Sequence, residues 1–182
     1  SNTALVVNNR ANTTVNLNVT GNVTGDPSAT GGVLLIMGGE NCNAACVTNF
    51  TIGGNFNFSI PLFFAGNTRT TTSGSHTLNL GGNFIISSPS SRFNAYRFTT
   101  TPGNFQVNFT GTSATYTVPP NVLLGTSGNQ SNVLCNWQVS AGASLTMTSG
   151  SVLACNNGRS LSVLGELTCQ DNTELIATTT GA

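Results

Sequence analysis

Charge is the property this chain has least of. Only 5% of its 182 residues are charged, against roughly 25% in an average soluble protein, and there is no lysine at all. Five arginines balance five acidic residues, so the formal net charge is zero. Binding of nucleic acid needs clustered Arg or Lys to neutralise phosphates, and the arginines here are scattered. The composition therefore argues against a nucleic-acid partner, and the lack of lysine excludes an internal Lys–Asn isopeptide cross-link.

Long apolar runs are also missing. The longest covers residues 33–37, whereas a membrane-spanning helix needs about 20 apolar residues. Glycine interrupts nearly every window of a dozen residues, and strong helix formers are sparse. We therefore expect neither a membrane span nor helices. Hydrophobic residues still make up 38% of the chain, which is enough to build a core rather than a disordered segment.

Short alternating segments are the main secondary-structure signal. Apolar and polar residues alternate in 15–20, 77–80, 115–118, 144–148 and 160–163. A period of two places the apolar side chains on one face of a strand. The sequence therefore predicts an all-β protein.

A repeated phrase indicates how these strands are arranged. Gly-Asn-Phe occurs at 54–56, 82–84 and 103–105, with the second interval shorter than the first. Repeats spaced by roughly 20 to 30 residues are typical of stacked units, and Asn-Gly hairpin turns are nearly absent. We predict a right-handed parallel β-helix (β-solenoid) with irregular coils, in which Asn136, Asn156 and Asn172 form side-chain ladders at corners. The alternative is an antiparallel β-sandwich, pilin-like with a donated strand.

The domain prediction is one all-β domain over 1–182. Residues 51–182 are expected to form the solenoid coils. Residues 1–50 are expected to form an irregular N-terminal cap or assembly segment, because Pro27, the apolar run and a cysteine loop break the pattern.

Several phrases resemble the repeats of large secreted β-helix surface proteins of Bacteroidetes-type bacteria. They are HTLNLGGNF, FTGTSATYTV and VSAGASLTMTSGSVLACNNGRSLSVLGELTC, within residues 50–176. The resemblance implies a right-handed parallel β-helix, export and an adhesive or surface role. It carries no shared set of catalytic residues.

The five cysteines are candidates for disulfides. Cys42 and Cys46 share a turn-rich loop, for which a small disulfide loop is favoured over half a metal site. Cys135, Cys155 and Cys169 follow at solenoid-like intervals and are expected to lie one above another, as a disulfide or a thiol ladder. The odd total leaves one thiol buried, unpaired within the chain, or bonded to another chain.

Seven Asn-x-Ser/Thr sequons are candidate glycosylation sites if the chain is secreted. They begin at Asn12, Asn18, Asn22, Asn49, Asn57, Asn108 and Asn129.

No catalytic constellation is evident. Glu166, Asp171 and Glu174 are the only acidic cluster, and a solvated corner is favoured over a calcium or catalytic patch. His76 is interpreted as a loop histidine, since no nucleophile elbow is present. We therefore predict a non-enzymatic protein without cofactor or metal.

The predicted function is that of an extracellular structural protein, the subunit of a surface filament or adhesin. Copies are expected to associate through open strand edges. The expected assembly strands contain Leu5, Val6, Val7, Val15, Leu17 and Val19.

Three alternatives remain. A glycan-binding segment of a larger adhesin would use exposed Trp137, Tyr96 or Tyr116. A polysaccharide lyase or hydrolase would use the acidic cluster. An ice-binding solenoid would present Thr-x-Thr pairs such as Thr146 and Thr148, but the next coil is expected to carry Ser162-Val163-Leu164 in that place.

Overall fold

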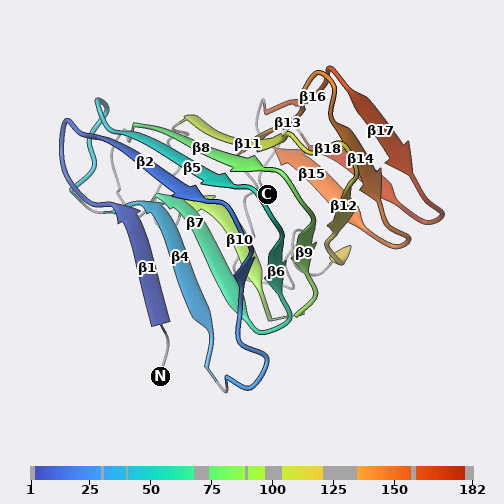
Figure 1. The fold of residues 1–182 in the computed structure, drawn as a ribbon, viewed down its shortest axis with the longest axis horizontal. Coiled ribbons are helices and arrows are strands. Elements are labelled where there is room, and N and C mark those ends of the chain that lie inside the picture. The colour runs from blue at the N-terminus through green and yellow to red at the C-terminus, as the bar shows by residue number, and fades with distance from the viewer. Residues whose placement is uncertain are drawn as a thin grey trace.

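The computed structural model describes residues 3–29, 31–39, 41–67, 74–88, 90–96, 104–120, 135–156 and 159–178. Within these ranges the chain is built from short β-strands that wind around one core (Figure 1). The predicted all-β class is confirmed.

The strands form three long sheets and one short one. Sheet A has the order β1(Thr3–Asn8), β4(Val33–Gly38), β7(Leu62–Asn67), β10(Arg92–Tyr96). Sheet B has the order β2(Thr14–Val19), β5(Val47–Ile52), β8(Ser75–Leu80), β11(Asn104–Phe109), β13(Asn136–Val139), β16(Leu161–Val163). Sheet C has the order β3(Val23–Thr24), β6(Phe56–Phe58), β9(Phe84–Ile86), β12(Ala114–Thr117), β14(Ser144–Met147), β17(Glu166–Cys169). Sheet D pairs β15(Val152–Asn156) with β18(Glu174–Thr178).

Every strand pairing among the described residues is parallel, and each strand lies beside the strand one coil later. The predicted parallel β-solenoid is therefore confirmed, and the antiparallel sandwich is wrong. The coil length varies, because the pairing of Asn16 with Asn49 spans a longer stretch of chain than the pairing of Ser144 with Glu166. The irregular coils expected from the sequence are thus present, and the last coil is the shortest.

The first fifty residues contribute to the same sheets as the rest. Strands β1 to β5 lie within residues 3–52 and pair in register with the next coil. The irregularity predicted for this segment lies in its connections, where extra residues lengthen the loops without interrupting the strands. Residue 51 therefore marks no break in sheet B, because it lies inside β5.

The Gly-Asn-Phe phrase marks a coil only in its first two copies. Phe56 pairs with Phe84 on sheet C, so the first interval of the phrase is one coil. The third copy is different, because Phe105 pairs with His76 on sheet B. Tyr116 takes the next place after Phe84 on sheet C. The second, shorter interval therefore joins two different faces of the solenoid.

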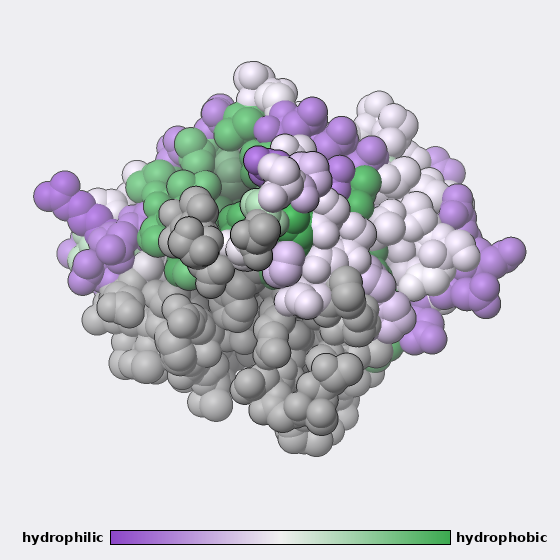
Figure 2. Space-filling model, turned by 90° about the horizontal axis from the view of Figure 1, so that it is seen from below, coloured by the Kyte–Doolittle hydropathy of each residue, from purple (hydrophilic) through white to green (hydrophobic). Residues whose placement is uncertain are grey.

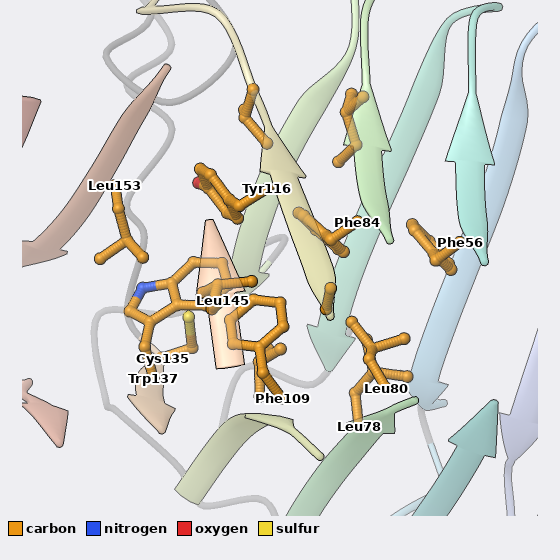
Figure 3. Packing of buried hydrophobic residues seen from close by; sticks show 14 of the residues in the cluster. Phe56, Leu78, Leu80, Phe84, Phe109, Tyr116, Cys135, Trp137, Leu145 and Leu153 are labelled. Carbon is orange, nitrogen blue, oxygen red and sulfur yellow. The ribbon is translucent and has the colours of Figure 1, made fainter. Parts of the chain in front are cut away.

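Inward-facing side chains form columns along the solenoid axis. Phe56, Phe84 and Tyr116 lie on successive coils (Figure 3). Their rings stack with centroids 5.3 Å and 5.6 Å apart and interplanar angles of 9° and 15°. Stacked coils bring like positions within about 5 Å of each other, which favours aromatic contact. All three side chains are buried, so these columns form the core.

Asparagine side chains hold the corner before sheet C. The backbone N–H of Asn55 donates to Oδ1 of Asn22 at 2.8 Å, and the N–H of Asn83 donates to Oδ1 of Asn55 at 2.9 Å. The N–H of Thr115 continues the series by donating to Oδ1 of Asn83 at 2.8 Å. Each amide therefore satisfies a backbone donor of the next coil that no strand partner reaches.

This ladder lies mostly at positions other than those predicted from the sequence. Asn136 does take part in one such contact, since Ser160 N–H donates to its Oδ1 at 3.1 Å. Asn172 instead occupies the left-handed backbone region with φ 58°, which asparagine tolerates in turns. The side chain of Asn156 lies outside the described residues.

Sheet D is joined to the core by two aromatic side chains. The hydroxyl of Tyr116 donates to the Val152 carbonyl at 2.9 Å, and the indole N–H of Trp137 donates to the Ala154 carbonyl at 3.0 Å. Both carbonyls belong to β15, whose other edge pairs with β18. These side chains therefore supply the hydrogen bonds that a neighbouring strand would otherwise give.

Candidate functional site

The two ends of the solenoid are open sheet edges. Strands β1, β2 and β3 terminate sheets A, B and C at one end, and β16, β17 and β18 terminate sheets B, C and D at the other. An edge strand presents backbone N–H and C=O groups that another chain can pair with. Both ends therefore offer the backbone chemistry of strand addition.

The core is exposed at these ends. Leu5 is 43% exposed, but its in-register partner Leu35, one coil inward, is 2% exposed. At the opposite end Leu175 is 52% exposed and its partner Leu153 only 1%. Val163 is likewise 43% exposed, whereas its in-register partner Val139 is 0% exposed. Side chains that are core elsewhere are uncovered on the end coils, because no coil of the described residues lies beyond them.

The large exposed apolar side chains of the described residues all belong to the end coils. They are Leu5, Val6, Val163, Leu164 and Leu175. Scattered exposed apolar residues are common on protein surfaces, but a gathering of them marks an interaction site. Here the gathering coincides with the open strand edges.

The residues proposed from the sequence as assembly strands lie at one of these ends. Leu5 and Val6 are exposed, and Val7, Val15, Leu17 and Val19 are half-buried on β1 and β2. No local pattern in the sequence indicates the other end, with Val163, Leu164 and Leu175. Recognising it requires the register of the last coil, since Leu175 differs from buried Leu153 in having no described strand beyond it.

The face seen from below in Figure 2 shows apolar residues gathered on the side where the first coils lie. Weakly polar and hydrophilic residues cover the remaining described surface in that view. Strand β4 is apolar on both of its faces, since Met37 and its neighbour Ile36 are both buried although they point to opposite sides of the strand. A continuous apolar run is typical of a strand covered on both faces.

Sheet C carries two short rows of threonine on its outer face. Thr115 pairs with Thr146, and Thr146 pairs with Thr168. A second row runs beside the first, where the hydroxyls of Thr117 and Thr148 are 2.8 Å apart. Ser162-Val163-Leu164 does not follow Thr146 and Thr148 on sheet C, because Val163 pairs on sheet B. The expectation that the array is interrupted at Ser162-Val163-Leu164 is therefore wrong.

The three C-terminal cysteines do not form a ladder. Cys135 lies just before β13 of sheet B, Cys155 lies on β15 of sheet D, and Cys169 lies on β17 of sheet C. Cys135 and Cys155 are buried in the core, and Cys169 is exposed on the end coil. Their similar flanking residues reflect similar strand ends on three different faces, so the predicted vertical stacking is wrong.

Cys42 and Cys46, by contrast, are brought together. Both are buried thiols, and the two side chains are hydrogen-bonded to each other. Burial, followed by the hydrogen bond and charge of Cys46, raises the pKa of Cys42 to about 12. Burial also acts to raise the pKa of Cys46. Hydrogen bonds from the Cys42 thiol and from backbone N–H groups outweigh burial, so the pKa of Cys46 lies below its ordinary value.

His76 is a core residue rather than a loop histidine. It lies on β8 with its side chain buried, between Thr48 on the preceding coil and Phe105 on the following one. Burial lowers its pKa to about 4, so the imidazole is neutral at physiological pH. Its alternation with Leu78 and Leu80 on the same strand was the sequence signal for an inward position.

Two of the three aromatic residues considered for glycan binding are not available for it. Trp137 and Tyr116 are fully buried and bond to β15, so their predicted exposure is wrong. The side chain of Tyr96 lies outside the described residues.

The acidic cluster is spread over the last coil. Glu166, Asp171 and Glu174 are all exposed, on β17, a turn and β18 respectively. Among the residues that the structure describes, no group of three His, Cys, Asp or Glu is placed to hold a metal ion.

The sequons differ in how their amides are used. Nδ2 of Asn49 donates to Asn16 at 2.8 Å, and Nδ2 of Asn108 donates to Asn79 at 2.8 Å. Nδ2 is the atom that glycosylation modifies, so a glycan there would remove these contacts. Asn12, Asn18, Asn22 and Asn57 are exposed, and Asn129 lies outside the described residues.

In the described part of the chain there is no helix long and apolar enough to cross a bilayer. Searches of protein-family models, of curated proteins and of solved structures found no match to this chain.

Proposed function

We propose that this chain is a structural subunit that associates end to end with further copies of itself outside the cell. The observation that carries the proposal is the paired exposure at the two ends, where Leu5 and Leu175 are uncovered while Leu35 and Leu153 are buried. A second copy stacked on either end would cover these side chains and pair the edge strands.

Head-to-tail stacking is the arrangement we propose. Within the solenoid every neighbouring pair of described strands is parallel, and a head-to-tail copy continues that direction across the junction. A head-to-head pair would instead join like ends through antiparallel junctions. Heterologous contacts that do not close into a ring produce filaments.

The extracellular location is supported by the uncharged polar surface and by the exposed sequons Asn18 and Asn57. Zero net charge gives little electrostatic repulsion between copies, which favours association. The absence of lysine, together with the scarcity of carboxylates, leaves few charges to desolvate along a lateral or end contact.

Negative-stain electron microscopy of the purified chain, combined with sedimentation velocity over a range of concentrations, tests this proposal. We expect fibrils or a ladder of oligomers that lengthens with concentration. Monodisperse monomers at every concentration would contradict it.

The threonine array favours a second candidate function, binding to ice. Five threonines lie on adjacent coils of the outer face of sheet C, which also carries Glu166 on its last coil: Thr115, Thr117, Thr146, Thr148 and Thr168. Coils are about 4.8 Å apart and alternate residues about 6.6 Å apart, so methyl and hydroxyl groups form a two-dimensional lattice. Threonine is stiff at χ1, and such a rigid lattice can hold surface water in an ordered pattern. Ice recrystallisation assays test this candidate directly, and unaltered crystal growth would reject it.

A further inference from the structure

The loop between β4 and β5 contains a matched pair of thiols. Cys42 and Cys46 are hydrogen-bonded to each other, and both lie beneath a surface loop in which Asn41, Ala44 and Ala45 are exposed. The pair also contacts the preceding coil. Sγ of Cys42 lies 3.4 Å from the Asn8 carbonyl oxygen, an alternative acceptor for its single proton, and the thiol of Cys46 donates to the Arg10 carbonyl at 3.0 Å.

The same loop is tied to the first coil by asparagine contacts. Nδ2 of Asn43 donates to Oδ1 of Asn12 at 2.8 Å, and the N–H of Asn12 donates to Oδ1 of Asn43 at 3.2 Å. The N–H of Asn41 donates to Oδ1 of Asn9 at 3.1 Å. Residues 8–13 form the corner between β1 and β2, in the first coil of the described stack. The cysteine loop is therefore a clamp on the exposed end of the solenoid.

Oxidation of the pair would leave no buried acceptor without a donor. The Asn8 carbonyl also accepts from Gly39 N–H at 2.6 Å, and the Arg10 carbonyl also accepts from the Thr13 hydroxyl at 2.6 Å. Both carbonyls thus keep a partner when the sulfurs lose their protons. The hydrogen bonding of these two carbonyls therefore favours neither the dithiol nor the disulfide.

We propose that Cys42 and Cys46 form a reversible redox latch that stabilises the first coil, with Cys46 as the attacking sulfur. The oxidant is a low-molecular-weight disulfide. The Cys46 thiolate attacks one sulfur of that disulfide and releases one small thiolate, which takes up a proton. The Cys42 sulfur, after losing its proton to solvent, attacks Cys46 and releases the second small thiol. Two protein thiols are thereby oxidised by two electrons, and one small disulfide is reduced to two thiols.

The order of attack follows from the contacts around each sulfur. Cys46 accepts hydrogen bonds from the Asn43 N–H at 3.1 Å and from the Cys42 thiol, and such donors stabilise a thiolate. Cys42 has the higher pKa, because burial and then the neighbouring Cys46 disfavour its thiolate. Once Cys46 is capped, its negative charge is gone and Cys42 becomes easier to ionise. The resting pair therefore favours attack by Cys46, and the capped pair favours resolution by Cys42.

The test is to incubate the folded full chain with oxidised glutathione, alkylate it and map the thiols by peptide mass spectrometry. We expect wild type to lose two alkylation sites, both in the peptide that contains Cys42 and Cys46, and to regain them with reductant. Cys42→Ser should accumulate one glutathione adduct on Cys46, because the resolving sulfur is absent. Cys46→Ser should form no adduct at Cys42 under the same conditions. Cys155→Ser is the matched buried control and should oxidise as wild type does.

Hydrogen exchange on the wild-type protein provides a readout that requires no variant. Oxidation should slow exchange at the amides of Asn12 and Cys46 and leave the turn at Thr173 unchanged. Pairing of Cys42 or Cys46 with another cysteine, an adduct on Cys42 in preference to Cys46, or unchanged exchange after full oxidation would overturn the proposal. The measurements use thiol mapping and local exchange, so they do not depend on whether copies stack end to end.

Discussion

The indole N–H of Trp137 donates a 3.0 Å hydrogen bond to the carbonyl oxygen of Ala154. Tyr116 makes the equivalent contact with Val152 at 2.9 Å. Together they provide hydrogen-bond donors to two carbonyls on the edge of β15 that has no strand beside it in the described structure. The residues that looked most suited to binding a sugar are therefore internal supports of the fold.

Tyr116→Phe should destabilise the protein by about 1–2 kcal/mol, because it leaves the buried Val152 carbonyl without its donor while keeping the aromatic ring. Trp137→Phe should cost more, since it also opens a cavity. Equilibrium denaturation in urea measures both changes. A Tyr116→Phe variant as stable as wild type would show that the hydroxyl contributes nothing.

His76 should make stability depend on pH. Its pKa is about 4 in the folded chain and 6.5 in the unfolded one, so the unfolded state binds more protons between these values. The contribution of the neutral, buried imidazole to the free energy of unfolding is fully present above pH 6.5 and is lost as the pH falls toward 4. By pH 5 wild type should lose about 2 kcal/mol relative to its value at pH 7.5.

His76→Leu provides the comparison, because titration of the acidic residues contributes equally to both proteins and cancels in the difference. We expect the variant to lack this part of the pH dependence. Parallel stability curves for the two proteins between pH 7.5 and 5 would contradict the buried, neutral state of His76.

The asparagine ladder should contribute measurably to stability. Asn55→Ala removes the acceptor for Asn83 N–H and should cost about 1 kcal/mol. Asn57→Ala, two residues away and exposed, is the matched control and should change stability by less than about 0.5 kcal/mol. Thermal melting distinguishes the two variants. Equal effects would show that the contact between Asn55 and Asn83 does not stabilise the fold.

End-to-end stacking predicts that each end can be blocked separately. Leu5→Lys and Leu175→Lys place a charge on the uncovered core of opposite ends, a device that prevents strand pairing at edges. Each variant alone should remain monomeric by sedimentation velocity, and an equal mixture should give dimers only. Asn57→Lys, on an exposed lateral position, should polymerise as wild type does.

A head-to-head arrangement gives a different result. Each single variant would still dimerise through its unmodified end, and mixing the two would add nothing. Continued growth of long assemblies by either single variant would contradict stacking through these ends.

The threonine array predicts a face-specific effect on ice. Thr146→Lys interrupts the centre of the array, whereas Thr77→Lys alters an equally half-buried position on sheet B. If the array binds ice, inhibition of recrystallisation should be lost in the first variant and kept in the second. Equal activity in both would place the binding elsewhere.

Local signals in the sequence were sufficient for the strands. The alternation in 15–20 and 77–80 became β2 and β8, because a period of two is a property of the strand itself. The interval between Phe56 and Phe84 matched the length of one coil. The interval to Phe105 did not, because sheets B and C can begin with the same turn chemistry and no local signal tells them apart.

The candidate site likewise has a part that the sequence predicts and a part that it does not. The sequence indicated the N-terminal edge through Leu5 and Val6, because an apolar strand at the start of a stack has a neighbour on one side only. It could not indicate Leu175 or the row of Thr115, Thr146 and Thr168, because both depend on which residues of distant coils come into register. Variable loop lengths change that register from coil to coil.

The sequence alone therefore determined an uncharged, all-β, stacked protein, since composition and alternation act residue by residue. Tertiary structure decided which side chains share a column, that Trp137 and His76 are internal, that Cys42 meets Cys46, and that the core is uncovered at both ends. The physical reason is that these contacts join residues on different strands and coils, and their partners are set by parallel register and loop length rather than by neighbours in the chain.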